Sequence, residues 1–199
     1  DVFLDNTLSP DDVLELGFDH VVTATGSIWK PSIMDEKSAP VLVDKTNTIF
    51  TPEDVLNGCE LKSPVIVFDF DYYYMGGLMA EFIKDLGHEV MIITPFDKVS
   101  PWSFNSNEID DIELRLLEKD IRVLTQHRII TVEDSSVKTI QKVSHEENDI
   151  DRGSLVLVGF RKQNDSLYNQ LNSSEAALKA SGIKSLQNIG DSNAPGAVV

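Results

Sequence analysis

Residues 64–93, PVIVFDFDYYYMGGLMAEFIKDLGHEVMII, carry the clearest signal of the fold in this sequence. It predicts a buried strand at 65–68, a tight loop, a helix at 74–86 that ends before Gly87, and a second strand at 89–94. This order is the opening unit of a dinucleotide-binding fold, in which helices join parallel strands. The sequence therefore predicts an α/β fold.

The loop between the first strand and the helix lacks the glycines that a dinucleotide needs. In the fingerprint of such sites, glycines let the backbone approach a pyrophosphate. Counted back from the helix, Gly76 stands for the third of these glycines, and the first two positions are Asp71 and Tyr73. Asp69 and Asp71 place two carboxylates where the diphosphate would sit, and they would repel it. We interpret this loop as a nucleotide-binding scaffold whose phosphate site has been lost or put to another use.

Two features of this loop have alternative interpretations. Asp69 and Asp71 would either bind a metal ion or lie in a solvated or hydrogen-bonded loop, and we favour the loop because a motif this short is weak. The aromatic run Tyr72–Tyr74 would either stack on an adenine or pack between a sheet and a helix, which is the commoner role of tyrosine. The second strand ends at Thr94, with no acidic residue there to bind a ribose 2′-hydroxyl.

The rest of the chain predicts a second, discontinuous domain around this unit. We expect a partial FAD/ADP-type dinucleotide domain at residues 1–50 and 165–199. Between them, residues 51–164 would form an inserted NAD(P)-like Rossmann domain of the glutathione-reductase type, with a β-meander. From both ends of the sequence we expect this chain to be a fragment of a longer protein. The local pattern predicts a strand at 2–4, irregular chain at 27–50, a hairpin at 128–144, a polar turn at 145–152 and a third meander strand at 154–158.

Two glycine turns in the flanks supply the candidate nucleotide-binding residues. Thr25 and Gly26 follow a short apolar strand, and Gly190 and Asp191 follow another near the end of the chain. Small residues let a backbone pass close to a dinucleotide, and an aspartate there accepts hydrogen bonds from ribityl or ribose hydroxyls. Because buried parallel strands carry ligands at their carboxyl ends, the segments ending at Gly26 and Asp191 should be neighbouring parallel strands. The alternative is an ordinary glycine turn after a strand.

The composition restricts the partners and the chemistry. The 199 residues carry 17 basic and 33 acidic side chains, a formal net charge of −16, which repels nucleic acid and anionic membranes. The single cysteine, Cys59, excludes an internal disulfide and a cysteine-ligated cluster within this chain, and fits a reducing, cytoplasmic location. The four histidines are scattered. We therefore expect no catalytic residue and no metal site in this chain.

Five segments, in order along nearly the whole chain, carry a resemblance to a known family. They are VVTATG at 21–26, TPEDVL at 51–56, YYMGGLMAE at 73–81, SLVLV at 154–158 and LQNIGDSNAP at 186–195. They resemble the C-terminal region of the trimethylamine dehydrogenase family of NADH:flavin oxidoreductase-like enzymes, which includes dimethylamine and histamine dehydrogenases. The resemblance implies a parent with an N-terminal TIM barrel that holds FMN and a 4Fe–4S cluster. A two-domain region follows, which in trimethylamine dehydrogenase holds ADP.

This resemblance places Thr25, Gly26, Gly190 and Asp191 at the FAD/ADP site of the intact protein, while the barrel's flavin, cluster and substrate residues match nothing here. The implied activity is amine oxidation by the barrel's FMN, with electrons leaving through the cluster to a partner such as an electron-transfer flavoprotein. This chain, without the barrel and the glycine-rich βαβ unit, would be an inactive scaffold or nucleotide-binding part. One rival is an NAD(P)H-binding domain of a flavin-dependent reductase, and another is a non-enzymatic docking module for an electron-transfer partner.

Overall fold

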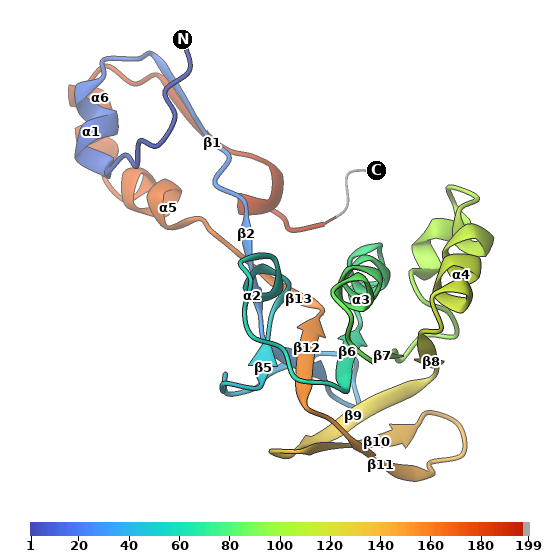
Figure 1. Ribbon diagram of the computed structural model, residues 1–199. Coiled ribbons are helices and arrows are strands. Elements are labelled where there is room, and N and C mark those ends of the chain that lie inside the picture. The colour runs from blue at the N-terminus through green and yellow to red at the C-terminus, as the bar shows by residue number, and fades with distance from the viewer. Residues whose placement is uncertain (197–199) are drawn as a thin grey trace. The chain divides into compact units, whose positions relative to one another are not determined.

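The computed structural model describes residues 1–196, and the chain divides into two compact units (Figure 1). The larger unit is Trp29–Phe160, and the smaller unit combines Asp1–Ile28 with the chain from Arg161 onward. Within residues 1–196, no helix is both long enough and apolar enough to cross a bilayer. The chain passes between the units through β2 (Ser27–Lys30) and β13 (Phe160–Gln163), which pair with each other.

A five-stranded parallel sheet forms the centre of the larger unit, with the strands in the order β5, β12, β6, β7, β8. β6 and β12 are buried along their whole length, as expected for parallel strands covered on both faces. The structure is therefore a mixed α/β fold built on a parallel sheet. The strands are β5 (Ile49–Phe50), β12 (Ser154–Val158), β6 (Val65–Asp69), β7 (Val90–Ile93) and β8 (Arg122–Leu124).

Helices cover one face of this sheet. α3 (Met75–Asp85) connects β6 to β7, and α4 (Ile109–Glu118) connects β7 to β8 after a short 3₁₀ helix, η1 (Pro101–Phe104). α2 (Pro52–Leu56) follows β5 and begins with a proline and acidic residues. The apolar sides of these helices and alternate residues of the strands form one cluster, which includes Val67, Ile83 and Ile92. The predicted helix at 74–86 is thus confirmed within a residue at each end.

An antiparallel meander covers the other face. Its strands are β9 (His127–Val132), β10 (Ser136–Gln141) and β11 (Glu147–Asp151), with β10 in the middle. Two predictions were wrong here. The polar turn at 145–152 is β11, an exposed edge strand with only Ile150 partly buried, and the strand at 154–158 is β12 of the parallel sheet. A strand so exposed shows too little apolar alternation to be recognised.

Two predictions near the N-terminus were also wrong. The segment 27–50 is not irregular, since it contains β2, the paired strands β3 (Ser32–Met34) and β4 (Pro40–Leu42), and β5. Strands this short carry too few residues to show a period of two. Residues 2–4 form no strand and are exposed. Residues 29–50 belong to the larger unit, and the assignment of 1–50 with 165–199 to a nucleotide domain stays a prediction.

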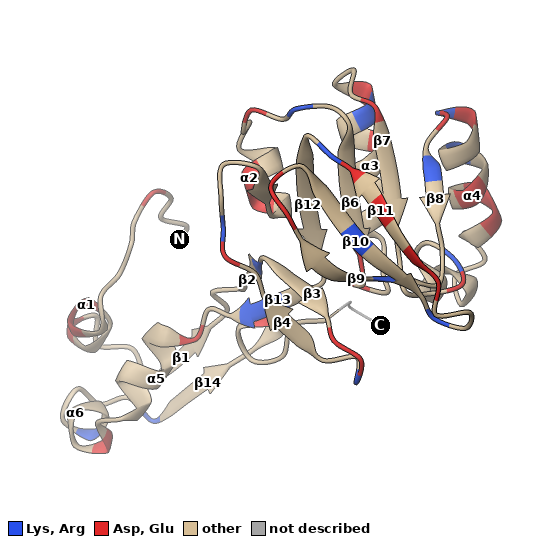
Figure 2. Cartoon of the chain, turned by 90° about the horizontal axis from the view of Figure 1, so that it is seen from below, with Lys and Arg blue, Asp and Glu red and all other residues tan. Residues whose placement is uncertain are grey.

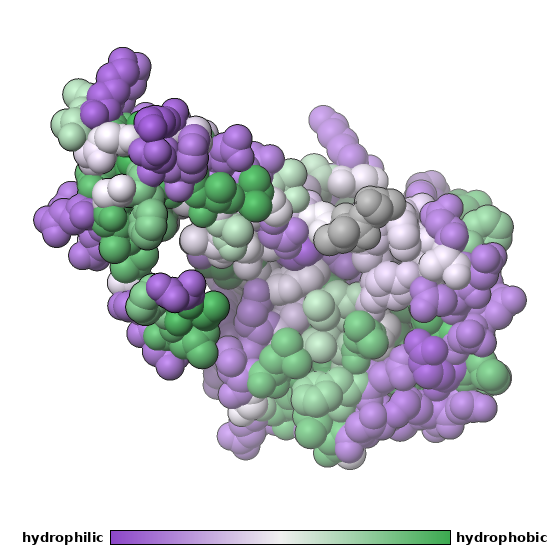
Figure 3. Space-filling model, turned by 90° about the horizontal axis from the view of Figure 1, so that it is seen from above, coloured by the Kyte–Doolittle hydropathy of each residue, from purple (hydrophilic) through white to green (hydrophobic). Residues whose placement is uncertain are grey.

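In the smaller unit, β1 (His20–Thr23) and β14 (Ser185–Asn188) form a parallel pair, which confirms that these two flanking segments are neighbouring strands. Three short helices accompany them: α1 (Pro10–Glu15), α5 (Ser166–Asn172) and α6 (Glu175–Ala180). Ser9 begins α1 with a capping box to Asp12. Much apolar surface stays open on this unit, as Figure 3 shows. Its large exposed side chains include Val2, Phe3, Leu4, Leu16, Phe18, Val22 and Ile189.

Arg152 holds the meander to the parallel sheet. Its side chain is 5% exposed, and it donates hydrogen bonds to the carbonyl oxygens of Thr48 (3.2 Å), just before β5, and of Glu133, in the β9–β10 turn. Its backbone N–H also binds the Ser135 carbonyl at 2.8 Å. Because these carbonyls belong to segments far apart in sequence, the Arg152 side chain fixes the position of one sheet on the other.

Replacement of Arg152 by Gln should lower the free energy of unfolding by about 2 kcal/mol, because the charged hydrogen bonds from this buried side chain to the Thr48 and Glu133 carbonyls are lost. Arg122→Gln is the matched control. Arg122 is exposed and its side chain has no hydrogen bond or ion pair within residues 1–196, so the control should change stability by less than about 0.5 kcal/mol. Urea unfolding measures both. Equal effects of the two substitutions would contradict this role of Arg152.

Candidate functional site

Asp69 ends β6 at the edge of the sheet where α/β folds bind their ligands. Its side chain is fully buried. Oδ1 accepts a hydrogen bond from the Asp71 backbone N–H at 3.1 Å, whereas the buried Oδ2 has no hydrogen-bond partner within residues 1–196. A carboxyl group in this position is costly to bury, so it needs a structural or functional reason.

Gly76, the second residue of α3, makes room for this carboxyl group. A Cβ atom on Gly76 would lie 2.0 Å from Cγ of Asp69 and 2.3 Å from its Oδ2. The third fingerprint glycine normally allows helix and strand to pack closely next to a bound pyrophosphate. Here the close approach of helix and strand at Gly76 makes room for the Asp69 side chain instead. This side chain lies against the first turn of α3, where a phosphate would otherwise bind.

The environment favours the neutral form of this group. The pKa of Asp69 is raised from 3.8 to about 7. Burial is the main cause, the hydrogen bond from the Asp71 N–H opposes it, and the nearby Asp71 carboxylate adds to it. The partial positive charge at the start of α3 favours an anion, but it does not outweigh the loss of hydration. Asp69 is therefore protonated in mildly acidic solution and ionises near neutral pH.

Aromatic side chains pack around the same loop. Tyr72 adopts φ 73°, a left-handed conformation, and its ring meets Phe96 edge to face at 5.2 Å between centroids. Tyr73 and Tyr74 lie 5.8 Å and 6.2 Å from the Trp102 ring. The Tyr74 hydroxyl donates to Glu108 at 2.9 Å. These contacts support the packing interpretation of the three tyrosines over stacking on an adenine.

The hydrogen-bonded interpretation of the Asp69–Asp71 loop is likewise supported, by the bond from Asp71 N–H to Asp69. Within residues 1–196, no group of three or more His, Cys, Asp and Glu side chains is arranged to hold a metal ion. A single unpartnered carboxyl oxygen falls far short of the six or more oxygen ligands that hard cations such as Ca²⁺ and Mg²⁺ take.

The smaller unit brings the four predicted nucleotide-site residues to the carboxyl ends of its two strands. Thr25 and Gly26 follow β1, and Gly190 and Asp191 follow β14 in a short 3₁₀ helix, η2 (Gly190–Ser192). Gly26 and Gly190 have φ values of 74° and 63°, and no atom lies within 4 Å of a Cβ built on either one. Both glycines are thus required by the backbone, and both leave open space beside it.

Asn164, which sequence reasoning missed, fixes the turn after β1. Its backbone N–H donates to the Gly26 carbonyl at 3.0 Å, and its side-chain amide donates to the Thr25 carbonyl at 3.1 Å. The Thr25 hydroxyl in turn donates to the Asn164 carbonyl. The Thr25 hydroxyl is thus used within the chain, and the backbone of the turn is held in place for any ligand that approaches Gly26.

The Asp191 carboxylate is also held by its own chain. Oδ2 accepts hydrogen bonds from Ser27 Oγ at 2.9 Å and Arg161 Nη1 at 2.8 Å, and Oδ1 accepts one from the Gly196 N–H at 3.4 Å. Sequence reasoning missed Ser27 and Arg161, because no local motif shows that β13 returns beside η2. Asp191 is therefore held and charge-neutralised by its own chain, and its remaining capacity to accept hydrogen bonds lies mainly on Oδ1.

Relatives of this chain are found over nearly its whole length. Residues 50–154 match the family described as OYE-like second alpha/beta domain. Dimethylamine dehydrogenase of Hyphomicrobium sp. (strain x) is 24% identical over 212 residues, which cover 94% of this chain and 28% of that protein.

Two solved structures have the same fold over this region. Histamine dehydrogenase from Rhizobium sp. 4-9 is 31% identical with a TM-score of 0.89, covering 97% of this chain and 29% of that one. The 6-hydroxypseudooxynicotine amine oxidase from Pseudomonas geniculata N1 is 31% identical with a TM-score of 0.87, covering 98% and 29%. The chain spans less than a third of the length of these relatives.

Gly76→Ala should destabilise the chain by about 3 kcal/mol, because the new methyl group overlaps the buried Asp69 carboxyl. Gly77→Ala is the matched control in the same helix. Its Cβ would meet its nearest neighbours at 3.5 Å, so the variant should be neutral or gain up to about 1 kcal/mol from helix propensity. Chemical denaturation measures both. If Gly76→Ala is as stable as Gly77→Ala, the close contact between Gly76 and the Asp69 carboxyl is excluded.

Asp69→Asn should change how stability depends on pH. Since the folded pKa of about 7 exceeds the unfolded value of 3.8, the wild-type chain loses stability as pH rises between these values and keeps that cost above pH 7. Asn mimics the protonated carboxyl and does not ionise. The stability of the variant relative to wild type should therefore increase as pH rises through this window, by up to ~4 kcal/mol at pH 8. Urea unfolding at pH 4, 6 and 8 measures the difference. A difference that does not change with pH would refute the burial of an ionisable Asp69.

Proposed function

This chain belongs to the family of OYE-like second alpha/beta domains, as the C-terminal region of a member of the trimethylamine dehydrogenase family, and we propose that it is part of a flavin-dependent amine dehydrogenase. The observation that carries the proposal is the structural match to histamine dehydrogenase over 97% of the chain. The parent would oxidise an amine with FMN and pass electrons through a 4Fe–4S cluster to an acceptor such as an electron-transfer flavoprotein. We place this activity in the cytoplasm.

The iron–sulfur cluster does not fit the residues of this chain. A 4Fe–4S cluster needs four cysteine ligands, and the chain has one cysteine, Cys59. Within residues 1–196, no clustered His, Cys, Asp or Glu side chains replace them. In this proposal the FMN and the cluster are both held by another part of the parent, and this chain would contribute no redox step of its own.

A nucleotide fits the smaller unit better. The open backbone at Gly26 and Gly190 would let ADP, or the ADP half of FAD, lie close to the carboxyl ends of β1 and β14. In this proposal Thr25, Gly26, Gly190 and Asp191 line one side of the site, and Arg161 holds Asp191 in place. A glycine-rich βαβ unit of the parent would supply the phosphate-binding side and cover the exposed apolar surface.

The larger unit, in the same proposal, is a Rossmann-like domain of the glutathione-reductase type that has become a scaffold. Its β6–α3 crossing supports this role, because Asp69 lies where a phosphate would approach the helix. An NAD(P)H-binding reductase domain, the rival function, would need that position free.

The acidic surface favours a second candidate role, docking of an electron-transfer partner. Acidic side chains are spread over α1, α2, α4 and β11, as Figure 2 shows. With a formal net charge of −16, the chain would attract a basic patch on such a partner through long-range forces that salt screens. This role is compatible with the first and does not require catalysis by the chain.

NADH and NADPH should not bind this chain measurably. The buried Asp69 and the carboxylate of Asp71 oppose a diphosphate at the start of α3. Calorimetric titration at pH 7.5 should show no saturable heat at ~1 mM nucleotide, far above the micromolar dissociation constants of working cofactor sites. A dissociation constant in the micromolar range would revive the reductase function.

The amine dehydrogenase proposal is tested on the longest natural polypeptide that contains this sequence. It should be coloured by flavin and cluster, and it should reduce an artificial dye with an amine such as dimethylamine or histamine. The 199-residue chain alone should be colourless and inactive with the same amines. A full-length protein that oxidises NADH but none of a broad panel of amines would overturn the proposal.

A further inference from the structure

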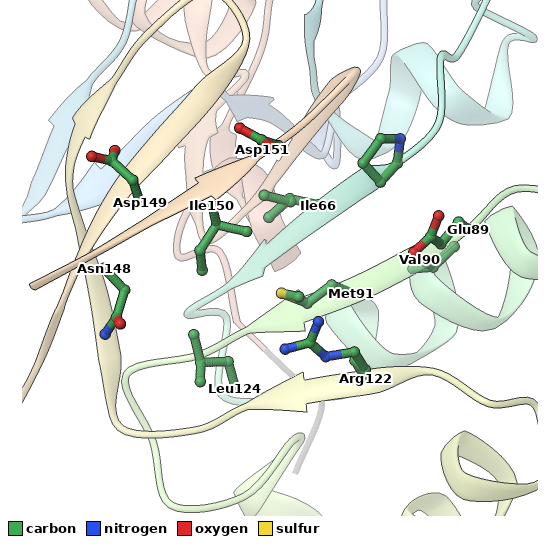
Figure 4. Close-up of a pocket in the computed structure, with 11 residues that line it drawn as sticks. Ile66, Glu89, Val90, Met91, Arg122, Leu124, Asn148, Asp149, Ile150 and Asp151 are labelled. Carbon is green, nitrogen blue, oxygen red and sulfur yellow. The ribbon is translucent and has the colours of Figure 1, made fainter.

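A cavity of about 450 Å³ lies between the parallel sheet and the meander of the larger unit (Figure 4). β6, β7 and β8 form its floor, and β11 forms its opposite wall. This volume is within the range of small-molecule pockets and exceeds that of a single buried water many times over. It is distinct from the loop at Asp69, which lies at the carboxyl end of β6, whereas Pro64 and Ile66 at the other end line the cavity.

The body of the cavity is apolar and incompletely covered. Ile66 and Met91 are partners in the parallel register and lie side by side on its floor, with Leu124 on the next strand. Ile150 points toward them from β11 (Figure 4). Met91, Leu124 and Ile150 are only partly buried, so an apolar ligand would remove more of their surface from water.

Two opposite charges flank this apolar floor. Arg122 is the register partner of Met91 and continues the same row onto β8. Glu89 lies directly before β7, two residues ahead of Met91, and lines the same cavity. Within residues 1–196, neither side chain forms a salt bridge or a side-chain hydrogen bond, although both line one cavity. A guanidinium and a carboxylate are thus both available to a ligand at the rim.

Two further carboxylates make the rim more acidic. Asp149 and Asp151 alternate with Ile150 along β11 and point away from the apolar floor in Figure 4. They add negative potential around the cavity without sealing it. A purely anionic ligand would be opposed by these groups and by Glu89, and a purely cationic ligand would leave the Arg122 guanidinium without a partner.

We propose that this cavity binds a small amphipathic zwitterion of the apolar α-amino acid type. The ligand's carboxylate would bind the Arg122 guanidinium, its ammonium group would bind Glu89, and its apolar side chain would lie on Ile66, Met91, Leu124 and Ile150. Such a ligand satisfies both rim charges and covers the exposed apolar floor in one step. The inference does not rest on the amine dehydrogenase proposal, because every residue in it belongs to the larger unit alone.

Three probes with the same phenyl group separate the two charges. L-Phenylalanine carries both, 3-phenylpropionate lacks the ammonium group, and 2-phenylethylamine lacks the carboxylate. In ¹⁵N–¹H spectra of the labelled 199-residue chain, phenylalanine should shift the amide signals of β7, β8 and β11 in a saturable way. Each analogue should bind about tenfold more weakly, because one charged hydrogen-bonding pair is lost.

Two variants assign the charges to their residues. Arg122→Gln should weaken phenylalanine binding about tenfold and leave 2-phenylethylamine unaffected, whereas Glu89→Gln should weaken phenylalanine and leave 3-phenylpropionate unaffected. Arg128→Gln on β9, which does not line the cavity, is the matched control and should bind like wild type. The proposal is overturned if phenylalanine produces no saturable shifts at β8 and β11, if either analogue binds as tightly, or if Arg122→Gln binds like its control.

Discussion

The contact between the Asp69 carboxyl and the first turn of α3 is the constraint on which the larger unit depends. A buried acid with one oxygen unpartnered destabilises a fold unless its surroundings require it. Here the absence of a side chain at Gly76 lets helix and strand pack against that acid at a distance no other residue allows. In the β6–α3–β7 unit, the carboxyl group of Asp69 occupies the space beside the first turn of α3 that the missing Gly76 side chain leaves.

The contact between Asp69 and α3 also affects the loop that joins β6 to α3. Because no diphosphate needs to be admitted, the crossing can carry bulky residues, and Tyr72, Tyr73 and Tyr74 pack on Phe96 and Trp102. The same unit then serves as a rigid support, with the sheet covered by helices on one face and by a meander on the other. In a parent enzyme that oxidises amines elsewhere, such a domain would contribute shape and surface, and any nucleotide would bind the smaller unit.

The sequence predicted those parts of the fold that have continuous apolar runs and glycines at the ends of helices and strands. The spacing from the helix identified Gly76, and the runs ending at Gly26 and Gly190 predicted that β1 and β14 pair in parallel. It did not predict β11, whose polar residues face water, or β3 to β5, which are too short for periodicity. Asn164 and Arg161 were missed because their contacts depend on where the chain returns in space, which no local pattern encodes.

Side-chain ¹³C NMR measures the protonation state of the Asp69 carboxyl group directly. With aspartate labelled at Cγ, the resonance of Asp69 is assigned by its absence in Asp69→Asn and followed from pH 3 to pH 9. If burial against α3 controls this group, it should titrate with a pKa of about 7, well separated from the exposed aspartates. A pKa near the ordinary value of 3.8 would show that the carboxyl is hydrated, and the account of a phosphate site filled by its own chain would be wrong.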